Sequence, residues 1–153
     1  METYNFSSPV GTLCIIIEDN AITGLFIDNN AELSDSCGNG LIMETVQELT
    51  EYFSGKRMLF DLPLNPAGTV FQKHVWEQLQ LIPYGKTRSY GDIAKAVGNP
   101  NAARAVGRAN NRNPIMIIIP CHRVIGADGA LVGYGGGIEV KKFLLELEAA
   151  HQA

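Results

Sequence analysis

Residues 115–129 read IMIIIPCHRVIGADG, and the rest of the chain is organised around this stretch. Its apolar, β-branched start predicts a buried strand, which Pro120 would end because proline cannot donate to a strand ladder. Cys121 would then lie at the end of that strand and face a cleft. His122 and Arg123 supply polar and cationic neighbours that favour a nucleophilic thiolate. A second interpretation remains open from the residues alone, in which Cys121 is a small buried apolar side chain.

Composition is typical of a globular protein from a reducing compartment. The 153 residues suffice for one domain or for a small lobe beside a larger one, and an apolar content of 46% is ordinary. The three cysteines, at positions 14, 37 and 121, form no C-x-x-C pair, so neither a disulfide framework nor a zinc site is expected. No signal peptide and no membrane-spanning run is visible. We therefore expect a cytoplasmic protein without a zinc site.

The net charge of −4 conceals an asymmetry along the chain. Residues 1–67 carry ten acidic and two basic side chains. Residues 68–125 carry eight basic side chains and two acidic ones, a local net charge of +6. A basic segment inside an acidic chain is typical of a protein that binds a polyanion, although solvated helix faces would give the same composition.

Residues 1–67 predict a structural lobe made of a small sheet and one helix. Runs of β-forming residues around a turn indicate strands, and a later apolar stripe with a helical period indicates an amphipathic helix. The strands are expected at 11–18 and 22–26, and the helix at 41–53 with Gly55 as its cap. The segment 57–68, with two prolines and a glycine, is typical of a connection between lobes.

Residues 68–153 predict a mostly helical lobe that contains a helix-turn-helix. T-x-x-Q at 69–72 and S-x-x-D at 89–92 are capping boxes, and each would begin a helix. The break Gly98-Asn99-Pro100 precedes a small-faced helix over 101–110, so two short helices are joined by a tight turn. Within the basic segment, this pattern indicates DNA binding.

Several side chains near these helix starts are candidates for contacts with DNA. Arg104 and Arg108 are four residues apart and would project from one side of the second short helix. Gln72 and Asn99 could add phosphate contacts beside exposed backbone amides.

The C-terminal part predicts a glycine-rich loop and a closing helix. The loop 133–137 holds one aromatic ring, Tyr134, and fits neither a dinucleotide-binding nor a Walker A pattern. The expected apolar stripe of the helix is Val140, Phe143, Leu144 and Leu147. Glu148 lies at the edge of that face, either solvated or held inward by a partner such as His122.

The chain resembles the O6-alkylguanine-DNA alkyltransferases over residues 71–148. Five features agree in order: S-Y before the first short helix, A-A-R-A-V-G, R-N-P, P-C-H-R-V and Y-G-G-G. The resemblance implies a two-lobed α/β fold, with a sheet-and-helix lobe over 1–67. A DNA-binding and alkyl-transfer domain with a helix-turn-helix and an active-site cysteine would follow over 68–153.

By this resemblance, the protein would repair DNA by one irreversible transfer of the alkyl group from O6-alkylguanine, with O4-alkylthymine as a further candidate substrate. Cys121 would accept the group after the base is flipped out, and His122 would favour its thiolate through a bound water. Glu148 would orient the imidazole and Asn113 would brace the active-site turn. Arg104 would fill the gap in the base stack.

The resemblance also implies a guanine pocket formed by Tyr90, Val124, Tyr134 and Gly135. Tyr90 would rotate the target phosphate or donate to the leaving guanine. Val124 and Gly135 would contribute backbone amides, and Tyr134 its ring. The family often has Ser or Ala where Gly135 stands, so a hydroxyl contact is missing and the pocket would be roomier. The implied partner is double-stranded DNA with an alkylated guanine, bound by a monomer without cofactor or metal.

Two other functions fit part of these features. A non-catalytic module that recognises alkylated bases would share the helix-turn-helix but lack the cysteine, whereas Cys121 is present. A cysteine hydrolase would use Cys121 and His122, but hydrolases usually take nucleophile and base from distant segments. The basic helix-turn-helix would then have no role.

Overall fold

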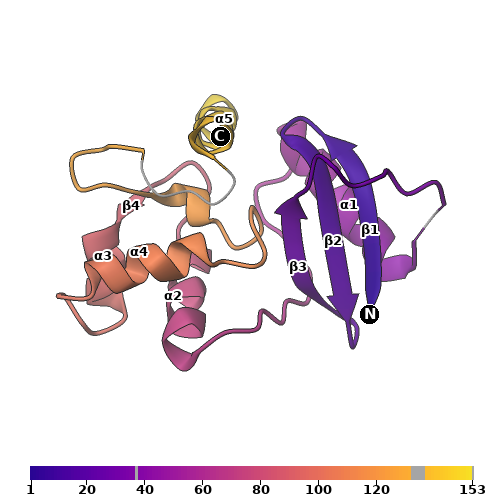
Figure 1. Cartoon of the computed structure of the whole chain (residues 1–153). Coiled ribbons are helices and arrows are strands. Elements are labelled where there is room, and N and C mark those ends of the chain that lie inside the picture. The colour runs from indigo at the N-terminus through magenta and orange to yellow at the C-terminus, as the bar shows by residue number, and fades with distance from the viewer. Residues whose placement is uncertain (37, 132–136, 153) are drawn as a thin grey trace. The chain divides into compact units, whose positions relative to one another are not determined.

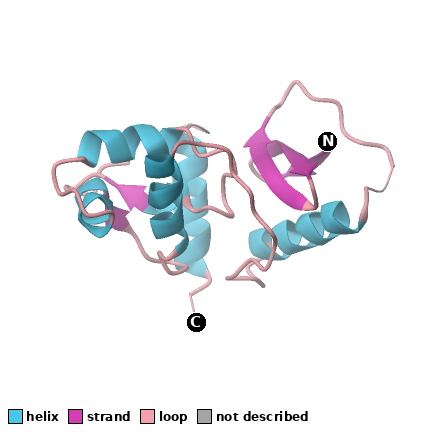
Figure 2. Ribbon diagram, turned by 90° about the horizontal axis from the view of Figure 1, so that it is seen from below, coloured by secondary structure: helices cyan, strands magenta, loops and turns pink. Residues whose placement is uncertain are grey.

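Two units make up the chain, Met1–Pro66 and Ala67–Ala153. The computed structural model describes residues 1–36, 38–131 and 137–152. Within these ranges, no helix is both long enough and apolar enough to cross a membrane. The predicted fold class is confirmed, because the first unit is a sheet with a helix and the second is mostly helical (Figure 2).

A three-stranded antiparallel sheet with one helix against it forms the first unit (Figure 1). Its elements are β1 (Glu2–Ser8), β2 (Gly11–Glu18), β3 (Ala21–Ile27) and α1 (Gly40–Phe53). The predicted turn between β2 and β3 is confirmed. Asp19 and Asn20 have φ of 51° and 60°, the left-handed geometry that matches the twist of a two-residue hairpin. The predicted helix is also confirmed, and Asn39 caps it.

The segment predicted as a connection packs in part on the first unit. Leu64 forms a parallel bridge to Ile22, and Ile22 N donates to the Pro63 carbonyl at 2.9 Å. Earlier in the same segment, Asp61 N donates to Glu48 Oε1 of α1 at 2.9 Å. The part of this segment up to Pro66 therefore belongs to the first unit.

The second unit consists of helices and a two-stranded parallel ladder. Its elements are α2 (Val70–Gln80), β4 (Arg88–Ser89), α3 (Tyr90–Ala96), α4 (Ala103–Asn111), the 3₁₀ turn η1 (Cys121–Arg123), β5 (Val124–Ile125) and α5 (Ile138–Ala150). Both predicted capping boxes are confirmed. The side chains of Thr69 and Ser89 each accept a hydrogen bond from the N–H three residues later. In return, the side chains of Gln72 and Asp92 accept the N–H of Thr69 and of Ser89. Each cap stabilises its helix start by about 1 kcal/mol.

The predicted helix-turn-helix is formed by α3 and α4, which pack on each other. Gly98 has a φ of 87° in the turn. The second helix begins at Ala103, two residues later than predicted, because Pro100 lies in the turn before it and no side chain caps it. Trp76 Nε1 donates to the Ala109 carbonyl at 2.9 Å and ties α4 to α2.

The apolar run 115–119 is buried as predicted, but it is not a strand. Ile117 has a φ of 71°, a left-handed conformation that interrupts an extended chain. Ile119 N donates to the Ile115 carbonyl at 3.1 Å, so the run turns back on itself and bonds its own backbone groups. Cys121 therefore follows a tight, buried turn instead of the end of a strand.

The closing helix α5 buries a different face from the predicted one. Its buried residues are Lys141, Leu144 and Glu148, whereas Phe143 is 38% exposed. The predicted apolar stripe is therefore wrong at Phe143. Two charged side chains take inward positions because each has partners around η1.

Candidate active site

Cys121 opens the turn η1 and is only 4% exposed. Its backbone N–H donates to the Ile119 carbonyl at 2.7 Å. Its own carbonyl accepts from Asn110 Nδ2 of α4 at 3.3 Å. The backbone that carries the thiol is thus held on both sides.

Asn113 lies beside the turn that leads into Cys121. Its Nδ2 donates to the Ile119 carbonyl at 2.8 Å, and its Oδ1 accepts from Ile115 N at 3.0 Å. One side chain therefore bonds both ends of the apolar turn, and the carbonyl that it holds also accepts the N–H of Cys121.

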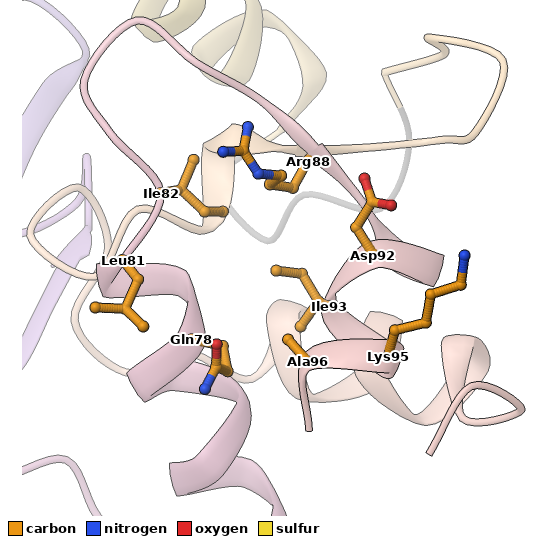
Figure 3. Close-up of a pocket in the computed structure, with 8 residues that line it drawn as sticks. All are labelled: Gln78, Leu81, Ile82, Arg88, Asp92, Ile93, Lys95 and Ala96. Atoms are coloured by element: carbon orange, nitrogen blue, oxygen red, sulfur yellow. The ribbon is translucent and has the colours of Figure 1, made fainter. Parts of the chain in front are cut away.

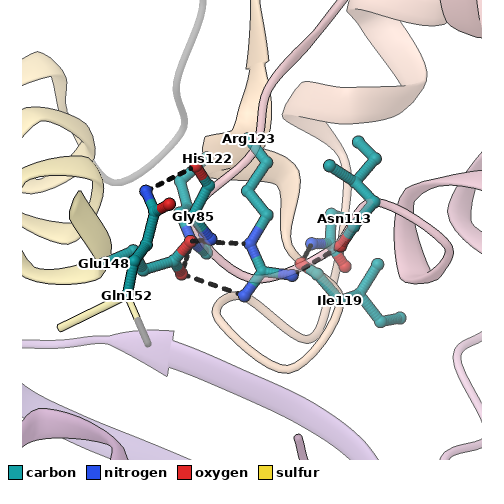
Figure 4. A network of polar contacts seen from close by, with 8 residues as sticks. Gly85, Asn113, Ile119, His122, Arg123, Glu148 and Gln152 are labelled. Atoms are coloured by element: carbon teal, nitrogen blue, oxygen red, sulfur yellow. Dashed lines mark hydrogen bonds and ion pairs between the residues drawn. The ribbon is translucent and has the colours of Figure 1, made fainter. Parts of the chain in front are cut away.

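A buried carboxylate is surrounded by hydrogen-bonding groups of His122 and Arg123 (Figure 4). Glu148 Oε2 lies 2.6 Å from His122 Nε2. Arg123 donates to both oxygens of Glu148, from Nε at 2.8 Å and from Nη2 at 3.0 Å. Gly85 N adds a bond to Oε1 at 3.1 Å. The carboxylate is almost fully hydrogen-bonded, as a buried charge requires.

Arg123 links this network to the segment after α2. Its Nη1 donates to the Ile82 carbonyl at 2.7 Å, and its guanidinium lies 5.7 Å from the centroid of the Tyr84 ring. The sequence identified Arg123 only as a cationic neighbour of Cys121. Its partnership with Glu148, 25 residues away, had no local signal.

Burial and charge give His122 and Glu148 different protonation states. Burial lowers the pKa of His122, and this outweighs the opposing effect of Glu148. Burial alone would raise the pKa of Glu148, but hydrogen bonds and charges from His122 and Arg123 hold it far below its usual value. At neutral pH the carboxylate is ionised and the imidazole neutral. Nε2 then carries the hydrogen toward Glu148, and Nδ1 is the basic nitrogen.

We expect these two groups to make the fold sensitive to acid. Both have a folded-state pKa below the unfolded value, so each stabilises the fold above its unfolded pKa and loses that contribution as the pH falls. For His122 the loss begins below about pH 6.5, and for Glu148 below about pH 4.3. Urea unfolding between pH 7.5 and 5 should show a decreasing free energy of unfolding.

The variant His122→Gln should reduce this pH dependence. His74→Gln, at an exposed histidine on α2, is the matched control and should leave it unchanged. The same pH dependence in all three proteins would contradict the protonation states given above.

The predicted guanine-pocket residues are described in part. Tyr90 is the first residue of α3, and burial, followed by the charge of Cys121, raises the pKa of its phenol. It is therefore a protonated donor at neutral pH. Val124 is fully buried in β5 and pairs with Arg88. Tyr134 and Gly135 lie outside the described residues.

The candidate DNA contacts lie on α4, in the turn before it and at the start of α2. Arg104 and Arg108 are exposed and lie one turn apart on α4. Asn99 lies in the turn before that helix, and its Oδ1 accepts from the N–H two residues later at 3.2 Å. Gln72, on α2, also has the structural role that the predicted capping box gives it, because its Oε1 accepts the N–H of Thr69 at 2.9 Å.

Sequence reasoning missed two buried polar residues of the site, Lys141 and Asn110. Lys141 precedes Glu148 by seven residues and shares its helix face, a spacing that could have indicated it. Asn110 carried no comparable signal, because its partner, the Cys121 carbonyl, is set by the tertiary fold.

A surface pocket of about 500 Å³ lies between the end of α2 and the β4–α3 segment (Figure 3). It is lined by Gln78, Leu81, Ile82, Arg88, Asp92, Ile93, Lys95 and Ala96. None of these is a predicted site residue. Within the described ranges, no group of three or more His, Cys, Asp or Glu side chains is placed to hold a metal ion.

Comparisons with known proteins cover both units. Residues 2–66 match the family described as 6-O-methylguanine DNA methyltransferase, ribonuclease-like domain. Residues 70–150 match 6-O-methylguanine DNA methyltransferase, DNA binding domain. The methylated-DNA–protein-cysteine methyltransferase of Methanosarcina acetivorans is 47% identical over 95% of this chain and 96% of its own length. The constitutive enzyme of that name from Bacillus subtilis is 47% identical, over 92% of this chain and 91% of its own.

Solved structures give the same result. The O6-methylguanine methyltransferase of Mycobacterium tuberculosis has a TM-score of 0.87 and 44% identity, over 99% of this chain and 94% of that one. A structure of M. tuberculosis OGT in complex with DNA has a TM-score of 0.90 and 46% identity over the same shares. These matches confirm the resemblance indicated by the sequence motifs.

Proposed function

The chain belongs to the 6-O-methylguanine DNA methyltransferase family, and from this premise we propose that Cys121 is the residue that accepts the alkyl group. The activity is that of a methylated-DNA–protein-cysteine methyltransferase, which repairs alkylated DNA by methyl transfer to a cysteine of the protein. One observation carries the assignment to Cys121: it directly precedes His122, whose Nε2 lies 2.6 Å from the buried Glu148 carboxylate. Cys14 has no such neighbours and lies in β2.

The network suits direct alkyl transfer. Glu148 holds His122 in the tautomer that leaves Nδ1 basic, so the imidazole can take the thiol proton through a water. The Cys121 sulfur then attacks the alkyl carbon. The S–C bond forms, the C–O bond breaks, and its electron pair stays on the guanine oxygen, which the released proton neutralises. The thioether is stable, so each molecule acts once.

The second unit supplies the DNA contacts in this proposal. The chain binds DNA, and we assign the double-stranded form with a flipped O6-alkylguanine as its substrate, with O4-alkylthymine as a further candidate. Exposed Arg104 in the first turn of α4 would take the place of the flipped base. Arg108 and Asn99 would contact phosphates. Tyr90 would donate its hydroxyl to the guanine as it leaves.

Arg104→Ala should slow transfer from duplex DNA by roughly tenfold or more while sparing reaction with free O6-methylguanine base, because only the duplex requires a filler for the base stack. Single-turnover rates on the two substrates measure the difference. Arg108→Ala, which removes the same charge one turn later, is the matched control and should mainly weaken DNA affinity and its salt dependence. An equal loss of rate on the duplex and on the free base in Arg104→Ala would contradict the proposal that Arg104 takes the place of the flipped base.

Stoichiometry tests the proposed function. Increasing amounts of a duplex with one labelled O6-methylguanine should transfer one methyl group per protein molecule and then stop. Tight binding without transfer would instead identify a module that only recognises the lesion. Continued turnover would favour a hydrolase.

We further propose that residues 68–153 hold all groups needed for DNA binding and alkyl transfer, and that residues 1–67 form a structural lobe. A monomer should suffice, because one chain carries every candidate residue. We also propose a cytoplasmic location, which the free thiol of Cys14 supports.

A further inference from the structure

A fully buried lysine lies beside the site, and the mechanism above does not use it. Lys141, on α5, has an exposed fraction of 0% and donates from Nζ to the Val124 carbonyl at 2.5 Å. The same Nζ lies 6.0 Å from the centroid of the Tyr90 ring, within cation–π range. Burial of an ammonium is costly unless nearby groups compensate it.

Lys141 and Cys121 are placed to act on each other. The helix α5 packs against η1, and Val124, whose carbonyl holds the lysine, directly follows η1. Burial lowers the pKa of Lys141, and the negative charge of Cys121 opposes that shift. The same charge contributes to the raised pKa of Tyr90. Lys141 Nζ thus lies beside the Tyr90 ring and beside the carbonyl of the third residue after Cys121.

The charged side chains of Arg123 and Glu148 at η1 balance each other. Arg123 is positive and Glu148 is negative, and two hydrogen bonds join them. His122 is neutral at neutral pH, and Tyr90 keeps its proton. Among the groups named here, Lys141 is therefore the one whose positive charge can act on the Cys121 sulfur.

We propose that Lys141 is a positioning residue that supplies the counter-charge of the Cys121 thiolate while it holds the Val124 carbonyl. This inference rests on the proposed role of Cys121 as alkyl acceptor. An opposite charge within about 4–6 Å favours the ionised form of a group by roughly one to three pKa units. When the S–C bond forms, the sulfur becomes a neutral thioether, so Lys141 loses its counter-charge.

The pH dependence of thiol reactivity tests the proposal. Lys141→Met keeps an unbranched buried side chain without the charge, and Lys142→Met changes the exposed neighbour as a matched control. The rate at which iodoacetamide modifies Cys121, followed by peptide mass spectrometry, should have its midpoint at a pH roughly one unit higher in Lys141→Met. Transfer from a duplex with O6-methylguanine should fall roughly tenfold at pH 7 and recover at higher pH. Lys142→Met should match the wild type.

A merely structural role would lower the melting temperature and leave the midpoint unchanged, and that result in a folded Lys141→Met protein would overturn the proposal. If Lys141→Met does not fold, the proposal can be tested in the wild-type protein. The pKa of Lys141, followed by NMR of its labelled side chain, should fall by roughly one unit once Cys121 is alkylated, because the coupling is reciprocal. An unchanged value would overturn the proposal. Iodoacetamide needs no DNA, so absence of transfer from the duplex would refute only the proposed function.

Discussion

Replacement of Cys121 by serine should abolish alkyl transfer and preserve DNA binding. Serine is nearly isosteric with cysteine, so the turn held by Ile119 and Asn110 should persist. Its hydroxyl is a far weaker nucleophile at neutral pH than a thiolate, and the transfer rate should fall by more than about 10³-fold. Single-turnover transfer from a duplex with O6-methylguanine and a binding titration on the same duplex measure the two properties.

Cys14→Ser is the matched control, because Cys14 is also a buried cysteine. It should retain the wild-type transfer rate. Wild-type transfer by Cys121→Ser, or loss of transfer in a stable Cys14→Ser protein, would refute the assignment of the acceptor.

Glu148→Gln should impair both stability and transfer. The substitution removes the anion that two Arg123 bonds and His122 share, and leaves the guanidinium buried without its counter-charge. Breaking a buried pair in this way costs about 3–5 kcal/mol. Urea unfolding should show that decrease, and the transfer rate near pH 7 should fall roughly tenfold or more because the imidazole loses its orienting partner.

Two further variants separate the effect of Glu148 on stability from its effect on the transfer rate. Glu146→Gln removes an exposed carboxylate from the same helix and should change neither property. The double variant Arg123→Met with Glu148→Gln removes both charges and should regain part of the lost stability without regaining the rate. A Glu148→Gln protein with wild-type transfer and wild-type stability would contradict the network.

Local signals predicted most of the secondary structure. The capping boxes at Thr69 and Ser89 marked two helix starts to the residue, because a cap needs only side chains within four residues. The hairpin at Asp19-Asn20 followed from turn chemistry in the same way. Family motifs, in turn, placed Cys121 in a helix-turn-helix protein of the correct class.

Features that depend on tertiary contacts could not be predicted from the sequence. Isoleucines at 115–119 have strong strand propensity, yet the amide of Asn113 and a left-handed Ile117 fold them into a turn. The strand propensity of this run therefore predicted its burial correctly and its extended conformation wrongly. The inward face of α5 was misassigned for a related reason, because Lys141 is buried by partners that periodicity cannot reveal.

The most direct test of the account is peptide mass spectrometry of the wild-type protein after incubation with a duplex that contains one O6-methylguanine. We expect one added methyl group per molecule, on the peptide that contains Cys121, with the peptides of Cys14 and Cys37 unchanged. A methyl group on another residue, or complete repair of the DNA with no mass change in the protein, would contradict it.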